Sequence, residues 1–167
     1  MTSDWFDLVY CRYLLLHLPD PGACLGEMRR VLKPGGVIVI EDGDLATATS
    51  LPPTALDAFA DLFMRLGPIR GVDYSVASRL QQLVKSAGFP DPKIRLHQPA
   101  IAEGEKRLLL KGSVEEAGPA FVSAGLITSE ELRHTLTAMQ AATDDPEVLV
   151  LMPRMSAVWA TKPASIG

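Results

Sequence analysis

The sequence predicts an α/β fold in which helices flank a mostly parallel sheet. Two apolar, strand-like runs, residues 6–10 and 37–40, lie on either side of a helical pattern. The segment Lys33-Pro34-Gly35-Gly36 ends that helix, because proline cannot continue a helix and glycine tolerates positive φ. Two strands joined by a helix are parallel neighbours or near neighbours in one sheet. The order strand, helix, strand is therefore the first sign of the fold class.

Composition limits the class of protein. The 167 residues contain 16 lysines and arginines against 20 aspartates and glutamates, a net charge of −4 without a basic cluster, so we expect no nucleic-acid partner. No apolar run approaches the length of a membrane span, and the first residues do not resemble a signal peptide. The two cysteines do not form a disulfide framework. We therefore expect one cytoplasmic domain over residues 1–167.

The first third of the chain has clear element boundaries. Residues 6–10 are almost continuously apolar, which predicts a strand buried on both faces. Asp20 followed by Pro21 predicts a helix start, with aspartate as the N-cap and proline in the first helical position. The turn at residues 33–36 follows, and residues 37–40 form the second strand.

The remaining elements follow from periodicity and from breaking residues. We expect a loop at 44–53, a helix at 54–66 ended by Gly67, a helix at 75–87 and an outer strand at 93–97. A helix at 113–124 should kink or break at Gly118-Pro119. Thr128 and Glu131 predict a capping box for a helix at 128–141. Residues 148–161 read as strand, interrupted at Met152-Pro153.

Three segments carry a family resemblance. FDLVYCRYLLLHLPDP with EMRRVLKPGG, then LQQLVKSAGFPDPKIRL, then VLVLMPRMSAVWATKP resemble the later part of class I S-adenosylmethionine-dependent methyltransferases of the small-molecule type. The resemblance implies a partial Rossmann-like fold that supplies the fourth to seventh strands, in the order 4-5-7-6 with the last strand antiparallel. It also implies S-adenosylmethionine as cofactor, a small-molecule methyl acceptor, and a possible helical lid at residues 50–72.

One family motif is missing. Members bind the cofactor around a glycine-rich loop between the first strand and a helix, and the pair Gly35-Gly36 lies instead between a helix and a strand. We therefore expect a truncated member of the family that is inactive alone. The alternative is a cofactor-free dimerisation or ligand-binding module built on the same scaffold. A nucleotide enzyme of another doubly wound family is disfavoured, because it needs the same kind of loop.

The resemblance places the cofactor contacts at the end of the first strand. Open α/β sheets bind ligands beyond the carboxyl ends of their strands. The cofactor-binding candidates are Tyr10, Cys11 and Arg12. Arg12 could pair with the carboxylate of the cofactor, and the alternative is an ordinary surface arginine. The cysteine is also compatible with a plain buried thiol.

The catalytic candidates are His17 and Asp42. His17 follows the first strand, where a family histidine faces the active site and acts as a base or orients substrate; the alternative is a structural histidine. Asp42 lies at the end of the second strand with Glu41 and Asp44, where a carboxylate could orient or deprotonate the acceptor. Capping or solvated loop acids are the alternative for all three.

The missing strands predict an assembly. In the full fold the strand at residues 6–10 is central, whereas here it forms an apolar edge with unpaired backbone groups. Such an edge pairs readily with another chain. We therefore expect a homodimer or a swapped assembly through the Phe6–Tyr10 edge, or a separate chain that supplies the missing half.

Overall fold

The computed structural model describes residues 4–164. The chain divides into two compact units. The first consists of the residues up to Asp44, Ser75–His97 and the residues from Met155. The second consists of Leu45–Tyr74 and Gln98–Arg154. The expected lid segment, residues 50–72, belongs to the second unit.

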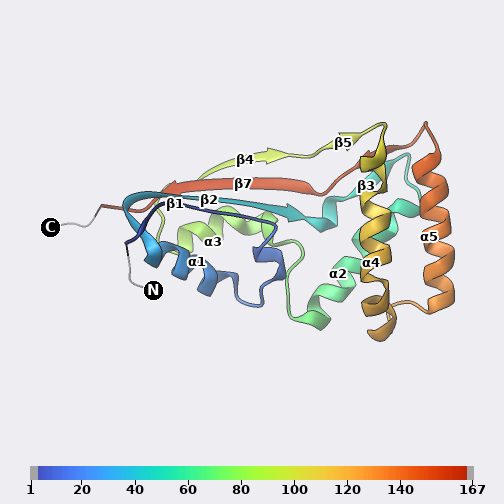
Figure 1. Ribbon diagram of the computed structural model, residues 1–167, viewed down its shortest axis with the longest axis horizontal. Coiled ribbons are helices and arrows are strands. Elements are labelled where there is room, and N and C mark those ends of the chain that lie inside the picture. The colour runs from blue at the N-terminus through green and yellow to red at the C-terminus, as the bar shows by residue number, and fades with distance from the viewer. Residues whose placement is uncertain (1–3, 165–167) are drawn as a thin grey trace. The chain divides into compact units, whose positions relative to one another are not determined.

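The first unit is built on a four-stranded sheet with the order β1-β2-β7-β4 (Figure 1). Its strands are β1 (Phe6–Arg12), β2 (Leu32–Asp44), β7 (Arg154–Thr161) and β4 (Lys93–His97). β1 runs parallel to β2, whereas β4 runs antiparallel to β7. The α/β class is confirmed, and the last strand, β7, runs antiparallel to its neighbour β4, as expected. The expectation that the sheet is mostly parallel is not confirmed, because parallel and antiparallel pairs occur together. The sheet is mixed because the last strand inserts between β2 and β4.

Helices cover one face of this sheet. The unit contains η1 (Leu15–His17), α1 (Pro21–Val31), η4 (Val76–Arg79) and α3 (Leu80–Ser86). α1 packs against both α3 and β2, and both helices lie below the strands in Figure 1. The side chain of Asp20 accepts a hydrogen bond from the amide of Ala23 at 2.9 Å, as predicted for an N-cap.

The burial of β1 differs from the prediction. A strand buried on both faces was expected, yet Phe6, Leu8 and Tyr10 are exposed, and Cys11 is the buried residue of the strand. β1 is an edge strand of the four-stranded sheet. A continuous apolar run predicts burial only where neighbouring elements cover both faces. The edge position itself is confirmed.

Within the described chain, the second unit contains three α-helices, three short 3₁₀ helices and a small antiparallel sheet. Its elements are η2 (Leu45–Thr47), β3 (Thr49–Leu51), η3 (Ala55–Asp57), α2 (Ala58–Arg70), β5 (Ala100–Ile101), η5 (Glu105–Leu108), α4 (Leu109–Ser123), α5 (Ser129–Asp144) and β6 (Leu149–Leu151). The sheet order is β3-β6-β5, with antiparallel pairing throughout. Of these helical segments, α2, α4 and α5 are α-helices and the others are short 3₁₀ turns.

An aromatic cluster joins α2 to α4 in this unit. The ring of Phe63 lies 4.8 Å from that of Phe59, 5.4 Å from that of Tyr74 and 5.2 Å from that of Phe121, between ring centroids. Two of these contacts are edge-to-face, the geometry that aromatic quadrupoles favour. Phe59 and Phe121 are buried. The aromatic residues of α2 therefore pack into the core of the second unit.

Several element boundaries differ from the prediction, and the turn expected at residues 33–36 lies within β2. α2 continues through Gly67 and Pro68 to Arg70, where Gly71 with φ +68° ends it. α4 is continuous across Pro119, so the predicted break does not occur. The expected loop at 44–53 contains η2 and β3, because β3 pairs with β6, which is distant in sequence.

Candidate functional site

The carboxyl ends of β1 and β2 meet at one edge of the first unit. The parallel register pairs Cys11 with Ile40 and Arg12 with Glu41. The amide of Tyr13 then donates to the carbonyl of Glu41 at 2.9 Å, which extends the pairing by one residue. Paired residues of parallel strands point to the same face of a sheet. Tyr10, Arg12 and Glu41 therefore share one face.

Glu41 joins the two other side chains of this group. The Tyr10 hydroxyl donates to Oε2 of Glu41 at 3.1 Å. The Nε atom of Arg12 lies 3.5 Å from the same oxygen, and the Arg12 side chain remains 57% exposed. An exposed ion pair of this kind is worth about 0–1 kcal/mol. The guanidinium therefore keeps most of its hydrogen-bonding capacity for a ligand.

Asp42 lies on the opposite face and is fully buried. Its Oδ2 accepts a hydrogen bond from the amide of Leu15 at 2.8 Å, and its Oδ1 accepts one from the amide of Gly43 at 3.2 Å. Burial raises the pKa of the Asp42 carboxyl, and the hydrogen bonds from backbone amides act in the opposite direction. The carboxylate thus fixes the start of η1 onto the end of β2.

His17 is the last residue of η1, and its side chain is exposed. Its backbone amide donates to the carbonyl of Leu14 at 3.1 Å, which closes the 3₁₀ turn. Because Leu15, in the same 3₁₀ turn as His17, donates its amide to Asp42, the two predicted catalytic residues lie in one region. Asp42 holds the 3₁₀ turn that carries His17, so the position of His17 depends on Asp42.

Cys11 is buried at the end of β1. Burial, followed by the charge of Asp42 and then by Cys24, raises the pKa of its thiol to about 12. Because only the thiolate is a strong nucleophile, the Cys11 side chain is unreactive as a nucleophile near neutral pH. Its contribution to a site at this edge is therefore its backbone.

Tyr13 was not among the predicted site residues. This residue has φ +49°, in the left-handed region that is costly for a side chain with a Cβ. Strained backbone of this kind concentrates at functional sites. No sequence signal marks the position, because tyrosine has no preference for left-handed backbone.

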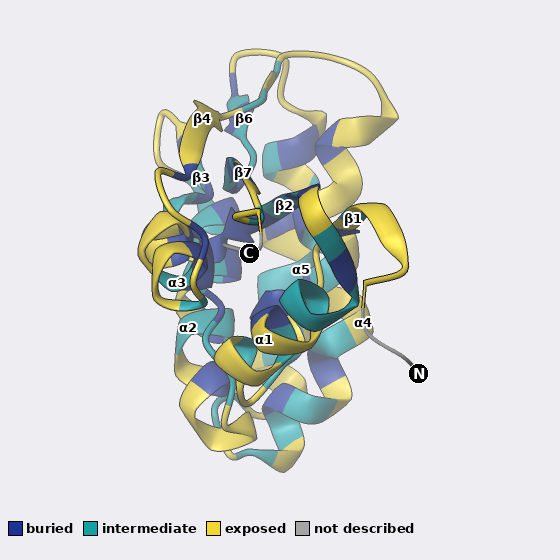
Figure 2. Cartoon of the chain, turned by 90° about the vertical axis from the view of Figure 1, so that its left-hand side faces the viewer, coloured by how far each residue is buried: buried dark blue, intermediate teal, exposed yellow. Residues whose placement is uncertain are grey.

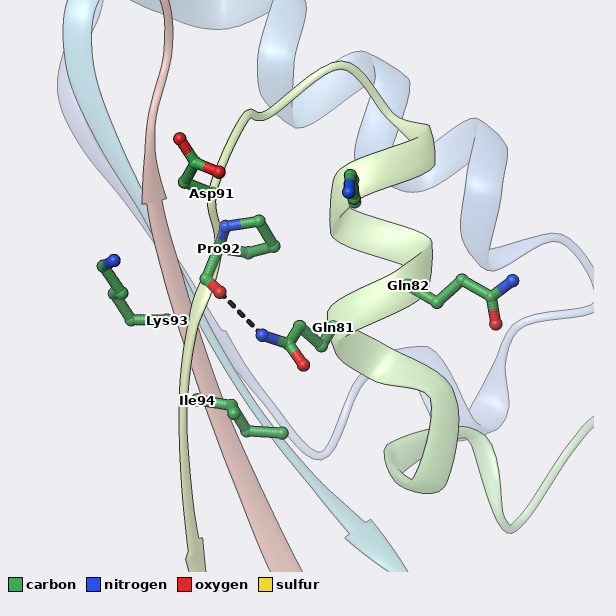
Figure 3. A pocket seen from close by; sticks show the side chains of 7 residues that line it. Gln81, Gln82, Asp91, Pro92, Lys93 and Ile94 are labelled. Carbon is green, nitrogen blue, oxygen red and sulfur yellow. Dashed lines mark hydrogen bonds between the residues drawn. The ribbon is translucent and has the colours of Figure 1, made fainter.

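The structure also contains a groove away from this edge. It has a volume of about 630 Å³ and lies between α3 and β4, with none of the predicted site residues in its lining (Figure 3). The Gln81 side chain donates to the carbonyl of Pro92 across it at 2.8 Å. The groove is wide open to solvent, so its lining does not define a second candidate site.

Two kinds of site are absent from residues 4–164. No group of three or more histidine, cysteine, aspartate or glutamate side chains in that range is arranged to hold a metal ion. No helix in the same range is long and apolar enough to cross a bilayer.

The sequence matches known methyltransferases. Residues 1–40 match the model of a family described as a methyltransferase domain. An uncharacterized methyltransferase of Schizosaccharomyces pombe is 45% identical over 50 residues, which make up 30% of this chain and 18% of that protein. The demethylmenaquinone methyltransferase of Staphylococcus haemolyticus is 31% identical over 114 residues, or 58% of this chain and 46% of that protein. The chain thus spans less than half the length of both relatives.

Solved structures share the fold at low sequence identity. A candidate methyltransferase from Bacillus halodurans superposes with a TM-score of 0.56 at 19% identity, covering 98% of this chain and 73% of that one. The phosphoethanolamine N-methyltransferase 2 of Haemonchus contortus, in complex with S-adenosylhomocysteine, gives 0.53 at 18% identity, covering 97% and 35%. These similarities identify the fold.

Proposed function

We infer that this chain, a member of the class I S-adenosylmethionine-dependent methyltransferase family, takes part in transferring a methyl group to a small molecule. S-adenosylmethionine is the cofactor of that family. The strands β1, β2, β4 and β7 then correspond to the fourth, fifth, sixth and seventh strands of the full fold. The segment 50–72 then corresponds to the helical lid insert of the family.

The observation that carries the proposal is the cluster at the ends of β1 and β2. Tyr10, Arg12 and Glu41 converge on one face at the carboxyl edge of a sheet, where α/β folds bind ligands. The strained Tyr13 follows directly. The guanidinium of Arg12, the hydroxyl of Tyr10 and the carboxylate of Glu41 are suited to a ligand that carries both an ammonium and a carboxylate group.

These residues fit one end of the cofactor. Arg12 would hold its carboxylate, with Tyr10 and the backbone of Cys11 beside it. When bound, S-adenosylmethionine would supply an electrophilic methyl group for the acceptor. Residues 13–20, which join β1 to α1, contain no glycine, so this connection does not form a glycine-rich cradle. We propose that the chain provides only part of the cofactor site and is inactive alone.

The proposed catalytic roles divide between two residues. His17 is exposed on η1 and can accept the proton that the methyl acceptor loses. Asp42 is buried, with each carboxylate oxygen accepting a backbone amide, so it acts by positioning the turn of His17. Asp42 is therefore a positioning residue in this proposal.

We also propose that the site is completed by assembly. The exposed edge of β1 is available to pair with a second copy, or with a chain that supplies the missing strands. The alternative function, a cofactor-free dimerisation or ligand-binding module, shares this edge and differs only in lacking cofactor affinity.

Titration with S-adenosylhomocysteine, followed through the backbone amide resonances, tests the proposal. A partial site predicts a dissociation constant of about 1 mM, equivalent to about 4 kcal/mol. Shifts should be confined to residues 10–13 and 41–42. Arg12→Ala should remove them, whereas Arg133→Ala, an exposed arginine of the second unit, should not.

Two results would contradict parts of this proposal. Micromolar affinity in the isolated chain would show a complete site and refute the claim that the chain is insufficient alone. An absence of shifts at about 10 mM ligand, well above the expected constant, would favour the cofactor-free module.

A further inference from the structure

We propose that the sheet face opposite α1 and α3 is a docking surface for an amphipathic helix with an acidic flank on another polypeptide. We call this surface the open face. It consists of Leu8, Tyr10, Val37, Val39, Ala157 and Trp159, bordered by Lys93 and Arg95. This inference does not depend on the methyltransferase assignment.

The strand register defines the open face. Leu8 pairs with Val37 and Tyr10 with Val39, so these four side chains point the same way. Their neighbours Ile38 and Ile40 are fully buried on the helix side. The apolar side chains of β1 and β2 are thus divided between a covered face and an uncovered one.

β7 and β4 continue the same division. Val158 and Ser156 are buried, and the Ser156 hydroxyl donates to the carbonyl of Ala77 in η4 at 2.9 Å, which places them on the helix side. Ala157 and Trp159 therefore point to the open face. Lys93 pairs with Trp159 and Arg95 with Ala157, so both cations border the same face.

The open face exposes apolar surface to water. The exposed fractions are 56% for Leu8, 54% for Tyr10 and 39% for Trp159. Sheets of α/β folds carry a helical layer on each face, since an apolar face left in water is costly. Contiguous apolar surface of this kind marks an interaction site. The open face therefore lacks a covering layer of helices.

The charges on the face select the partner. Lys93 and Arg95 form no ion pair within residues 4–164, and β4 is exposed along its whole length (Figure 2). Figure 3 shows Lys93 on the side of β4 away from α3, with Ile94 on the side toward it. Glu41, the acid of this face, already contacts Tyr10 and Arg12. A partner with acidic residues along the β4 side therefore complements the surface.

The shape of the surface favours a helix. Inside a sheet the backbone groups pair with neighbouring strands, so an occupant of the face must satisfy its own backbone hydrogen bonds. A helix does this and presents an apolar stripe. The same face of a second copy carries the same two cations, and its acid, Glu41, already contacts Tyr10 and Arg12, so it offers no free acid to Lys93 and Arg95. This disfavours face-to-face pairing of two copies.

Synthetic helical peptides of about 18 residues, or five turns, test the proposal. One peptide has a leucine stripe flanked by glutamates, the second replaces the glutamates by lysines, and a third scrambles the first. Trp5→Phe leaves Trp159 as the single indole reporter, since the chain has two tryptophans. We expect a saturable blue shift of its emission with the glutamate peptide, at least about tenfold tighter than with the lysine peptide, and none with the scrambled peptide.

Charge reversal on β4 is the decisive variant. Lys93→Glu/Arg95→Glu should invert the preference, so that the lysine peptide binds at least about tenfold more tightly. Lys106→Glu/Arg133→Glu makes the same change of net charge on the second unit and should leave the preference unchanged. Circular dichroism checks that each variant is folded.

Four results would overturn the proposal. They are equal affinity for both charged peptides, no binding of either, a Trp159 shift with phosphatidylglycerol vesicles but not with peptides, or a wild-type dimer that Lys93→Glu/Arg95→Glu converts to monomer. The third would assign the face to an anionic membrane, and the fourth to a second copy.

Discussion

Asp42 shows how one buried carboxylate connects folding with the candidate site. The sequence placed it correctly at the end of a strand, but its surroundings could not be read from the sequence. The amide of Leu15 lies 27 positions away and reaches the carboxylate only because β1 and β2 pair in parallel. Its role as an anchor for η1 is therefore a product of tertiary structure.

The raised pKa of Asp42 predicts a specific pH dependence. Because the pKa in the folded state lies above the unfolded value of about 3.9, the folded protein binds this proton more tightly. The contribution of Asp42 to stability is therefore present below the unfolded pKa and falls as pH rises toward the folded pKa. In Asp42→Asn this dependence is absent, so the variant should gain stability relative to wild type as pH rises. Urea unfolding between about pH 3 and pH 8 measures the difference.

Asp61→Asn is the matched control for this measurement. Asp61 is an exposed acid that pairs with Arg65 at 3.1 Å, an interaction worth less than about 1 kcal/mol. Asp61→Asn removes one carboxylate, as Asp42→Asn does, but from an exposed position, so a pH dependence seen only in Asp42→Asn is attributable to burial. A constant difference for Asp42→Asn over the same range would show that burial does not shift this carboxyl.

At the scale of elements, features set by nearby residues were predicted correctly. Strands that form by pairing with a distant segment were not. The capping box of α5 is present, with the Glu131 amide donating to the Thr128 hydroxyl at 3.2 Å and the Glu131 carboxylate accepting from the Thr128 amide at 2.8 Å. All of its atoms lie within four residues. β3 and β5 were missed because each exists only through pairing with β6. The continuity of α4 across Pro119 was missed for a similar reason, since packing overrides the local preference.

The close approach of α4 to α5 predicts opposite outcomes for two glycines of one helix. A Cβ at Gly118 would lie 2.7 Å from Cδ2 of Leu132 on α5, whereas a Cβ at Gly112 would meet no atom within 4 Å. Gly112→Ala should stabilise by about 0.5–1 kcal/mol, the helical gain of alanine over glycine. Gly118→Ala should lose that gain to overpacking and should be less stable than Gly112→Ala by about 1 kcal/mol or more. Denaturant unfolding provides both values.

A double-mutant cycle tests whether contact with Leu132 is what makes Gly118→Ala less stable than Gly112→Ala. In a Leu132→Ala background the obstacle is absent, so Gly118→Ala should recover the gain seen at Gly112. If Gly118→Ala costs the same in both backgrounds, the contact between these helices is not what requires glycine.

At the scale of the whole molecule, the sequence indicated the fold class and the edge position of β1. Through the family resemblance it also indicated an antiparallel last strand, and β7 does run antiparallel to β4. It could not show that the helices of the first unit leave one sheet face uncovered. Exposure is a property of the assembled layers, and an apolar run in the sequence reads the same whether or not a partner layer is present.

The edge and the open face lead to separate predictions about assembly. If β1 pairs with β1 of a second copy, light scattering at micromolar concentration should give twice the 18.0 kDa of one chain. Leu8→Lys should yield monomer, because it places like charges along the paired edge, a means by which natural edge strands avoid association. Lys93→Glu/Arg95→Glu alters the opposite edge of the sheet and should remain dimeric. A monomeric wild type would refute pairing of two copies through β1 and would leave this edge for a different chain, because the backbone groups along it still lack a strand partner.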